Sequence, residues 1–421
     1  TINGNYWWHL AAFFNVAIKQ QNRLFESENG RPPNDTEKAE IKTRALSTVR
    51  GTVQADQLKE SMGQNTLVFN LDTALRMMGD VAEFYVQNNV RNHYFVSISG
   101  YHIAEAGANP ITQAALTLSN GLTYVELFRA RGLDPDKFLR NFSWFFSNGM
   151  DPEYAVIGRV ARRIWSIAMR EIYGVGHRGQ QLKYHIQSSG RSLHAQEFTF
   201  NDYRTTLQAL YALADNANSL HTNSRDEAFG TPTEETVRDS MAIQMILSKE
   251  YGLLANENPM QGSHLSTWLT DRVEEEILRV FEEMHRRGGV LGSLEVNYQR
   301  NRIQDESMVY EHRKHSGELP IVGVNTFINP DAASLSADEA DAFDVDVTRS
   351  DEGEKRMVIE RNAAFKAEHA AKAEEGIARL KQVARDGGNL FEVMMDIVEY
   401  CSVGQVTQAL FETGGKFRRN M

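Results

Sequence analysis

The segment FVSISGYHIAEAGANP, residues 95–110, decides the fold class because it reads as a short strand that runs directly into a helix. Ser97 and Ser99 alternate with Val96 and Ile98, and alternate residues of a strand share a face. Strands buried on both faces of a parallel sheet are normally continuous apolar runs. The two serines therefore predict a sheet with one polar face.

The same alternation of strand and helix recurs from about residue 50 to residue 224. The strand-like runs are rich in Ser, Thr, Gly and Phe, and we expect strands at 51–56, 95–100, 142–148, 182–190 and 218–223. Apolar residues at helical spacing predict helices at 71–89, 110–132, 151–174 and 201–216. Repeated βα units predict a parallel sheet, either a barrel or a doubly wound sheet.

Polar residues occupy one face of every predicted strand. They are Thr52, Gln54, Asp56, Ser97, Ser99, Ser143, Ser147, His185, Gln187, Ser189, Ser219, His221 and Asn223. A buried polar group without a partner costs about 1–3 kcal/mol, so this set predicts a barrel with an open axis that a long polar ligand occupies. The competing explanation is that single serines satisfy one another or bind buried water.

Composition and charge narrow the function classes. The chain has 421 residues, of which 41% are hydrophobic and 24% charged, and its net charge is −11. This balance argues against a general nucleic-acid binder but leaves room for a local basic patch that binds one phosphate. Cys401 is the single cysteine, which excludes an intrachain disulfide and favours a cytoplasmic location. No run approaches the ~18–20 apolar residues of a membrane span, and we predict neither membrane association nor a metal site.

We expect four regions along the chain. Residues 1–230 form part of a barrel with a charged insertion at 19–47, and 231–327 form a helical extension that packs on it. Residues 328–354 are an acidic linker or loop. Residues 355–421 form C-terminal helices, beginning with one long charged helix, and are a candidate dimerisation region.

Four motifs carry a resemblance to a known family: SISGYHIAEAGA, FFSNGMDPEY, HIQSSGRSLHAQE and NSLHTNSRDEA. Together they resemble the catalytic barrel of the adenosylcobalamin-dependent acyl-CoA mutases, the methylmalonyl-CoA mutase family. The match runs from Thr1 to about Asn329 and includes the tail GGKFRRNM. The insertion ENGRPPNDTEKAE is similar to that of the family's fused branch. The resemblance implies a TIM (β/α)8 barrel followed by a helical C-terminal region, and an isomerase that rearranges acyl-CoA carbon skeletons by radical chemistry.

The resemblance also implies roles for single residues. His102 donates to the thioester carbonyl, a role that fits the charge that develops there, and the Tyr101 ring moves against the adenosyl group. Substrate contacts are expected from Gln54, Gln64, His185, Ser97, Ser99, Ser143 and Ser189. Adenosylcobalamin contacts are expected from Glu105, Gln187, Gly190, Asn223, Glu227 and Ala228. Glu105 and Glu227 can also be read as carboxylates that stabilise helix N-termini.

Substrate choice is expected to depend on Gln64 in LKESMGQNT. Family members that act on a substrate with a free carboxylate carry arginine at the matching position. A neutral amide cannot replace a bidentate arginine–carboxylate pair. Gln64 therefore predicts an uncharged acyl group, isobutyryl/n-butyryl, with pivalyl/isovaleryl-CoA and 2-hydroxyisobutyryl-CoA as alternatives.

Several family features are missing from the sequence. TINGNYWWHL matches the end of the third of eight strands, so we expect this chain to supply roughly the last six. The D-x-H-x-x-G signature and a phosphate loop are absent. A cobalamin-binding module and a G-protein chaperone module, with its GTP and Mg²⁺, are therefore expected outside this chain, and the assembled enzyme is expected to be a homodimer. Asn141 stands where mutases for charged substrates have an arginine that touches CoA, and Arg140 is expected to point away.

Two further function classes remain open. Glu311 and His315, spaced i, i+4, suit a metal-dependent barrel lyase, although such pairs are mostly surface contacts. The second class is a noncatalytic assembly subunit, because the helical C-terminal third of the chain could serve assembly.

Overall fold

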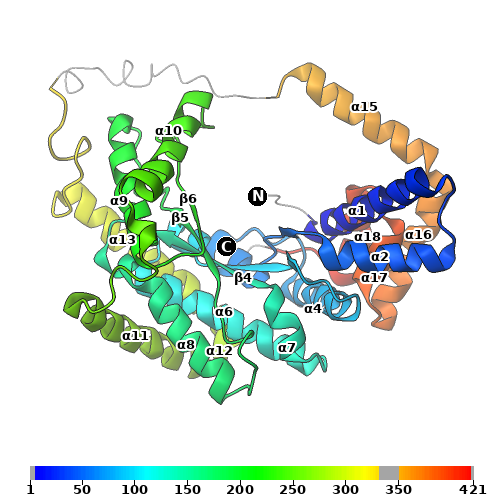
Figure 1. Ribbon diagram of the computed structural model, residues 1–421, viewed down its shortest axis with the longest axis horizontal. Helices are drawn as coiled ribbons and strands as arrows, with labels where there is room; N and C mark the ends of the chain where they lie inside the picture. The colour runs from blue at the N-terminus through cyan, green and yellow to red at the C-terminus, as the bar shows by residue number, and fades with distance from the viewer. Residues whose placement is uncertain (1–4, 331–349, 419–421) are drawn as a thin grey trace.

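The computed structural model describes residues 5–330 and 350–418. They form an α/β protein in which short parallel strands are surrounded by helices (Figure 1). The strands are β1 Gly51–Thr52, β2 His93–Tyr94, β3 Val96–Ser99, β4 Phe142–Asn148, β5 Tyr184–Ser188 and β6 Ser219–His221. The helices that follow them are α4 Leu71–Gln87, α5 Tyr101–Glu105, α6 Pro110–Ala130, α8 Ile157–Glu171, α9 Asn201–Ala214 and α10 Glu234–Met245. The predicted βα alternation is therefore confirmed.

The strands form an open parallel array. β1 pairs with β2, and β3, β4, β5 and β6 pair in that order, with only Phe95 between β2 and β3. The roughly six strands expected from this chain are present as β1 to β6, but a closed barrel is not found, because within the described residues no strand joins the edge at β1 to the edge at β6. The predicted strand end at residues 1–4 lies outside the described residues, and Tyr6 already begins helix α1, Tyr6–Asn29.

Local signals explain the helix boundaries. The side chains of Asn70 and Asn109 cap α4 and α6, and Pro110 occupies the first turn of α6. The chain turns after α6 at Gly132, whose φ of +80° suits glycine. Boundaries set by capping residues are readable from the sequence, which is why these helices lie where they were expected.

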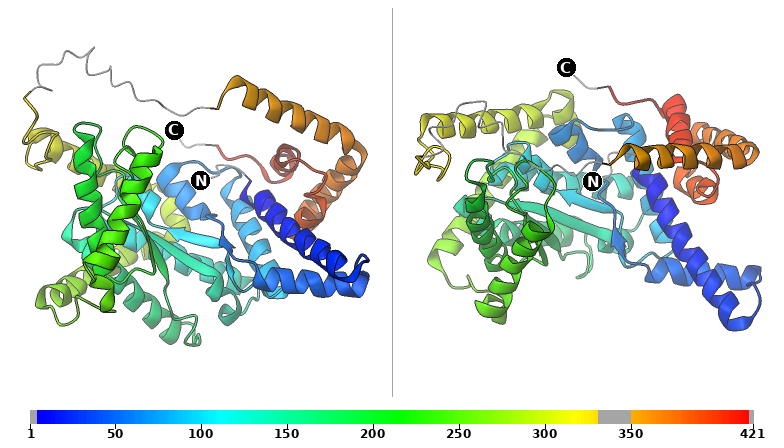
Figure 2. Two further views of the ribbon diagram at one scale, coloured as in Figure 1. Left: turned by 45° about the horizontal axis from the view of Figure 1, so that its top comes forward. Right: turned by 90° about the horizontal axis from the view of Figure 1, so that it is seen from above.

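The charged insertion is a helical hairpin rather than an irregular loop. α1 ends at Gly30, and α2, Asp35–Thr48, starts with a capping box between Asn34 and Glu37. The hairpin projects from the body, most clearly in the right view of Figure 2, and most of residues 19–40 are exposed.

Helices also fill the region between residue 246 and residue 316. They are η5 Ile246–Glu250, η6 Leu253–Ala255, α11 His264–His285, α12 Gly289–Glu295 and α13 Tyr298–Ser316. α11 packs against α6 and α8. Among the described residues, no helix combines the length and apolar composition that a membrane crossing requires.

The long charged helix expected after residue 355 is wrong in one respect, because the chain breaks at His369. It forms α15 Glu352–Glu368 and α16 Ala370–Asp386, followed by α17 Leu390–Ile397 and α18 Val403–Gly414. α16 packs on α17 and α18, and α17 packs on α1 and α4, whereas α15 buries no residue. Packing thus sets the direction of α16 and leaves α15 projecting (Figure 1). Most of the predicted acidic linker lies outside the described residues.

The outer face of the sheet forms the core. Trp144 of β4 and Ile186 of β5 are almost fully buried with residues of α6 and α8. The Trp144 ring lies 4.8 Å from that of Trp165. A Cβ added to Gly121 would lie 2.2 Å from Trp144, so only glycine lets α6 approach the sheet here. The apolar face of the sheet is therefore committed to packing, which leaves the polar face for a ligand.

Candidate functional site

The predicted polar face exists and is continuous across four strands. Register places Ser97 opposite Ser143 and Ser147 opposite Gln187. The exception is Phe145, which stands between Ser143 and Ser147 on the same face. Its ring stacks on Tyr101 at 4.9 Å with an interplanar angle of 6°. Phe145 was missed by the sequence analysis, although its position between two serines of one strand marks the face it lies on.

Most serines of the polar face bond to protein groups, as the competing explanation predicted for single residues. Ser143 donates to Ser97 at 3.4 Å, and Ser99 bonds to the His102 ring at 2.7 Å. Ser147 and Ser189 donate to Glu105. Their contribution to the site is therefore to build its wall and position other side chains.

His102 lies at the carboxyl end of β3, where Gly100 turns the chain into α5. It is 9% exposed, and burial, with the nearby Lys59 cation, lowers its pKa to about 3. The ring is therefore neutral at ordinary pH. Its Nδ1 bonds to Ser99; when the Ser99 hydroxyl donates, the proton is on Nε2, and that N–H can donate to a ligand.

Three predicted site residues meet beside His102. The Gln187 amide donates to the Tyr101 hydroxyl at 3.0 Å and to the Asn223 side-chain oxygen at 2.8 Å. Burial, and then the charges of Glu105 and Glu227, raise the pKa of Tyr101. Glu227 and Ala228 are exposed on the loop that follows β6. The arrangement leaves a carboxylate near a hydroxyl and two amides, at the carboxyl edge of the sheet.

Glu105 anchors the loop after β5. Its carboxylate accepts from the backbone N–H groups of Gly190 and Arg191, at 3.1 and 2.7 Å, and from Ser189 at 3.1 Å. Burial raises its pKa even though these bonds favour the ionised form. Neither role predicted for Glu105 from the sequence, a cofactor contact or a carboxylate at a helix N-terminus, included these bonds. They hold Gly190 next to the site.

His185 and the two predicted pocket glutamines are all half-buried. His185 bonds to Ser219 at 2.8 Å, and burial and the neighbouring His221 lower its pKa to about 4. Gln54 follows β1 after one intervening residue, Val53. Gln64 ends the π-helical turn η1, Glu60–Gln64, and its side-chain oxygen accepts from Lys59 at 3.1 Å.

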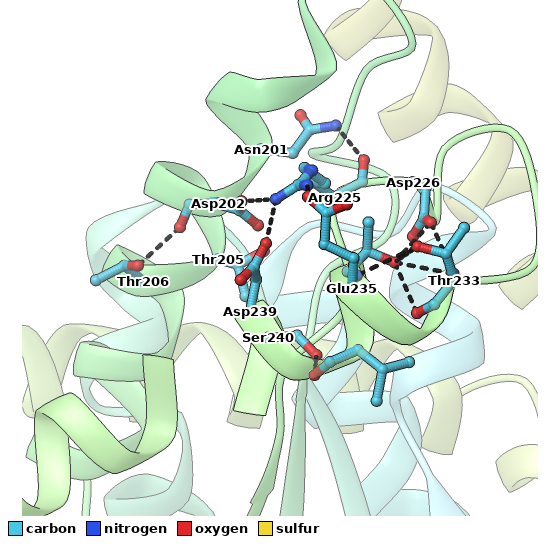
Figure 3. A network of polar contacts seen from close by, with 12 residues as sticks. Asn201, Asp202, Thr205, Thr206, Arg225, Asp226, Thr233, Glu235, Asp239 and Ser240 are labelled. Atoms are coloured by element: carbon cyan, nitrogen blue, oxygen red, sulfur yellow. Dashed lines mark hydrogen bonds and ion pairs between the residues drawn. The ribbon is translucent and has the colours of Figure 1, made fainter. Parts of the chain in front are cut away.

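Arg225 anchors the loop that carries Asn223 and Glu227 through a network of ion pairs (Figure 3). The guanidinium bonds to Asp202 of α9 at 3.1 Å, to Glu235 at 2.8 Å and to Asp239 of α10 at 2.5 Å. The network ties the loop to both flanking helices, and the loop therefore presents Asn223 and Glu227 from a fixed backbone.

Replacing Arg225 with methionine is expected to lower the free energy of unfolding by about 2 kcal/mol, since three carboxylates then lose a largely buried cation. Hydrogen exchange should accelerate in residues 222–233 before it does elsewhere. Arg279→Met is the matched control, because its ion pair with Glu276 is exposed on α11. An equal loss in both variants would exclude the anchoring role.

A basic cavity of about 430 Å³ lies at the opposite, amino edge of the sheet. Its cationic lining side chains are Arg50, Arg91, Arg140, Arg178 and Lys183, and no acidic side chain of the described chain lines it. Burial and the neighbouring Arg91 and Arg178 lower the pKa of Arg140, whose buried Nε has no hydrogen-bond partner among the described residues. Cations gathered without carboxylates suit a polyanion such as a pyrophosphate.

The expectation that Arg140 points away because it lies on a strand is wrong. Arg140 and Asn141 both belong to the 3-10 turn η2, Leu139–Asn141, rather than to the strand that follows. Arg140 lines the cavity, while buried Asn141 donates to the backbone oxygens of Val90 and His93. The turn brings the Arg140 side chain, rather than that of Asn141, to the cavity.

The alternative metal site receives no support from geometry. Glu311 pairs with Lys314 at 2.7 Å, and His315 lies 4.0 Å away. In residues 5–330 and 350–418, no group of three or more His, Cys, Asp or Glu side chains is placed to hold a metal ion.

The chain is similar in sequence to known proteins over most of its length. The sequence profile of the methylmalonyl-CoA mutase family matches residues 36–416. The chain is 58% identical to the fused isobutyryl-CoA mutase of Geobacillus kaustophilus, covering 100% of this chain and 38% of that protein. It is 32% identical to the 2-hydroxyisobutanoyl-CoA mutase large subunit of Aquincola tertiaricarbonis, covering 89% of this chain and 66% of that subunit. It is 31% identical to human mitochondrial methylmalonyl-CoA mutase, and the match covers 88% of this chain and 49% of the human protein.

Proposed function

Because this chain belongs to the methylmalonyl-CoA mutase family, we propose that it supplies the acyl-CoA-binding part of an adenosylcobalamin-dependent mutase that converts isobutyryl-CoA into n-butyryl-CoA. The chain spans 38% of the Geobacillus relative, and the activity proposed is that of the assembled enzyme.

The observation that carries the proposal is the polar face, which runs from the basic cavity at the amino edge to His102 at the carboxyl edge. β4 has seven residues and spans about 20 Å at ~3.3 Å per residue. An extended acyl-CoA laid along it would place its phosphates among the arginines and its thioester beside His102. Serine hydroxyls and the Phe145 ring would line the arm between them.

His102 would act on the thioester as a neutral hydrogen-bond donor. A donor fixed in a buried site stabilises negative charge that develops on a carbonyl oxygen. Ser99 fixes the ring, and Gln54 would make a second polar contact with the same group. The neutral state matters because a charged imidazolium could transfer its proton during the reaction.

Gln64 would select an uncharged acyl group. Its carboxamide carries no charge to pair with a substrate carboxylate, so the free carboxylate of a substrate such as methylmalonyl-CoA would stay unpaired in the pocket. Isobutyryl-CoA is the substrate we propose, and pivalyl/isovaleryl-CoA and 2-hydroxyisobutyryl-CoA are the alternatives that direct competition assays separate.

The residues at the carboxyl edge fit an adenosyl group. Glu227 is an exposed carboxylate beside the Tyr101–Gln187–Asn223 set, and carboxylates are common partners of ribose hydroxyls. Adenosylcobalamin, when bound, would supply the radical that starts the rearrangement. Glu227 and Asn223 would hold the ribose, with Glu105, Gln187, Gly190 and Ala228 nearby, and Tyr101 would shield the pocket from water.

The remaining parts of the enzyme would complete the sheet. β6 pairs only with β5 in the described chain, and its residues Ser219 and His221 are exposed. On the helix beside it, Met241 and Met245 are 61% and 49% exposed. Strands from outside this chain would cover this side and close a TIM barrel, next to a cobalamin-binding module and a GTP- and Mg²⁺-dependent chaperone module. A homodimer is part of the same proposal.

Replacing Arg140 with glutamine is expected to raise KM for isobutyryl-CoA about tenfold with kcat nearly unchanged, which corresponds to loss of one charge-assisted hydrogen bond to phosphate. The effect should shrink at high salt and vanish for the isobutyryl thioester of pantetheine, which has no pyrophosphate. Arg286→Gln, on an exposed pair with Glu282, is the control. An equal change in KM for both thioesters would show that Arg140 does not bind the CoA phosphates.

The proposed function is tested by supplying the complete enzyme, loaded with adenosylcobalamin, with isobutyryl-CoA and following n-butyryl-CoA by chromatography. Conversion that depends on adenosylcobalamin is the expected result. Conversion of methylmalonyl-CoA in its place would refute the specificity, and no conversion of either would refute the mutase role.

A further inference from the structure

Lys59 is a buried cation to which the proposed chemistry assigns no contact with the substrate, although its charge helps to lower the pKa of His102. Its side chain is 0% exposed, and its partner Glu60, at 2.7 Å, is 1% exposed. Glu60 also accepts from Tyr6 at 3.0 Å and from Thr66. A buried ion pair is costly to desolvate and often no better for stability than apolar side chains. We therefore looked to the proposed acyl pocket, rather than to stability, for the role of the Lys59–Glu60 pair.

The backbone brings Lys59 to Gln64. Lys59 is the last residue of α3, Gln57–Lys59, and the π-helical turn η1 follows at once. In a π-turn the residue five positions on replaces the usual neighbour four positions on, and such turns are frequent at functional sites. The Lys59 ammonium consequently reaches the Gln64 oxygen at 3.1 Å.

That contact fixes the orientation of the Gln64 carboxamide. A lysine ammonium has donors and no acceptor, so only the oxygen of an amide can face it. The amide NH₂ must then point away from Lys59. Glu60 holds the lysine in place from the other side. The turn also lies against α5, because a Cβ on Gly63 would be 3.6 Å from the His102 carbonyl oxygen.

We propose that Lys59 is a positioning residue for substrate recognition, which acts through Gln64 by holding the carboxamide with its NH₂ toward the acyl pocket. The inference rests on the proposed function. The acyl thioester, an acceptor, then meets a fixed donor at position 64. Without Lys59 the amide rotates freely and presents its oxygen for part of the time, which repels the same group.

The test is a double-mutant cycle in the complete, adenosylcobalamin-loaded enzyme, with kcat and KM for isobutyryl-CoA measured separately. One arm is Lys59→Met with Glu60→Gln, which removes both charges yet keeps an acceptor for Tyr6 and Thr66. The other arm is Gln64→Met. Each arm alone should raise KM about five- to tenfold, and the combination should raise it no further than either arm.

A matched control separates positioning from general damage. Asp80→Asn with Arg131→Met removes a partly buried ion pair, Asp80 to Arg131 at 2.5 Å. Its effect on KM should multiply with that of Gln64→Met, because it does not act through Gln64. Effects that multiply equally in both cycles would overturn the inference.

Gln64→Glu is a second variant that does not depend on removing the buried pair. The carboxylate can still accept from Lys59, and the thermal midpoint should stay near that of the wild type, but it has no NH₂. KM should rise about tenfold. If KM of the Gln64→Glu variant is unchanged and the wild type converts isobutyryl-CoA, the inference about Lys59 is overturned and the proposed function stands. If the wild type is inactive, both are overturned.

Discussion

Replacing His102 with alanine is expected to lower the turnover of the complete enzyme by about a hundredfold, the usual cost of losing one preorganised donor to a developing oxyanion. His102 is 9% exposed at the carboxyl end of β3. Its substitution removes the N–H and leaves the surrounding wall in place. KM should change much less than kcat, because the donor matters most when the carbonyl oxygen gains charge. Steady-state kinetics with isobutyryl-CoA provides the measurement.

Ser99→Ala is the control for the His102 variant. It keeps the ring and removes the hydroxyl that bonds to Nδ1 at 2.7 Å, so we expect a loss of about tenfold or less. His102→Gln should recover part of the rate, since its amide can donate. A His102→Ala enzyme with unchanged kcat would remove His102 from the reaction.

The pH dependence offers an independent check on His102. Burial lowers its pKa from the ordinary 6.5 to about 3, so the ring stays neutral when the pH falls through 6.5. The rate should therefore show no His102 titration between about pH 5 and pH 8. In the unfolded chain the same ring binds a proton near pH 6.5, so the stability contributed by the neutral ring is full above that pH and is lost progressively as the pH falls toward 3.

Replacing Gln64 with arginine is expected to lower kcat/KM for isobutyryl-CoA roughly 30- to 150-fold, or about 2–3 kcal/mol. Gln64 is half-buried and lies 3.1 Å from the Lys59 ammonium. A guanidinium there meets a second cation, and the uncharged acyl group offers no carboxylate to neutralise it. The figure is below that for a fully buried charge because part of the side chain reaches solvent.

Two comparisons make the Gln64→Arg result specific. Gln64→Met introduces no charge and should lose less than the arginine variant. Methylmalonyl-CoA, which carries the missing carboxylate, should bind the arginine variant more tightly than the wild type. Unaltered kinetics with both substrates would show that Gln64 lies outside the acyl pocket.

The strands and helices were predictable because their signals are local. Asn70 and Asn109 cap helices that begin at the next residue, and the alternation of Ser97 and Ser99 with apolar residues marks the polar face of β3. The helix break at His369 was not predictable, since both flanking segments favour helix and the direction of α16 depends on its packing against α17 and α18.

Site residues could be located by strand and face, but their partners could not. Whether Ser143 faces a ligand or Ser97 depends on the register between β3 and β4. The 3-10 turn before β4 brings Arg140 rather than Asn141 to the basic cavity. The π-turn after Lys59 creates a contact at a spacing of five residues, which no regular helical or strand period includes.

Within the described residues β6 has a strand partner on one side only, and we expect its other edge to promote association when the chain is concentrated. Backbone donors and acceptors in a row form a template on which a second copy can add its own strand, and the exposed methionines of α10 lie beside that template. Because association depends on concentration, dilution is expected to keep copies apart.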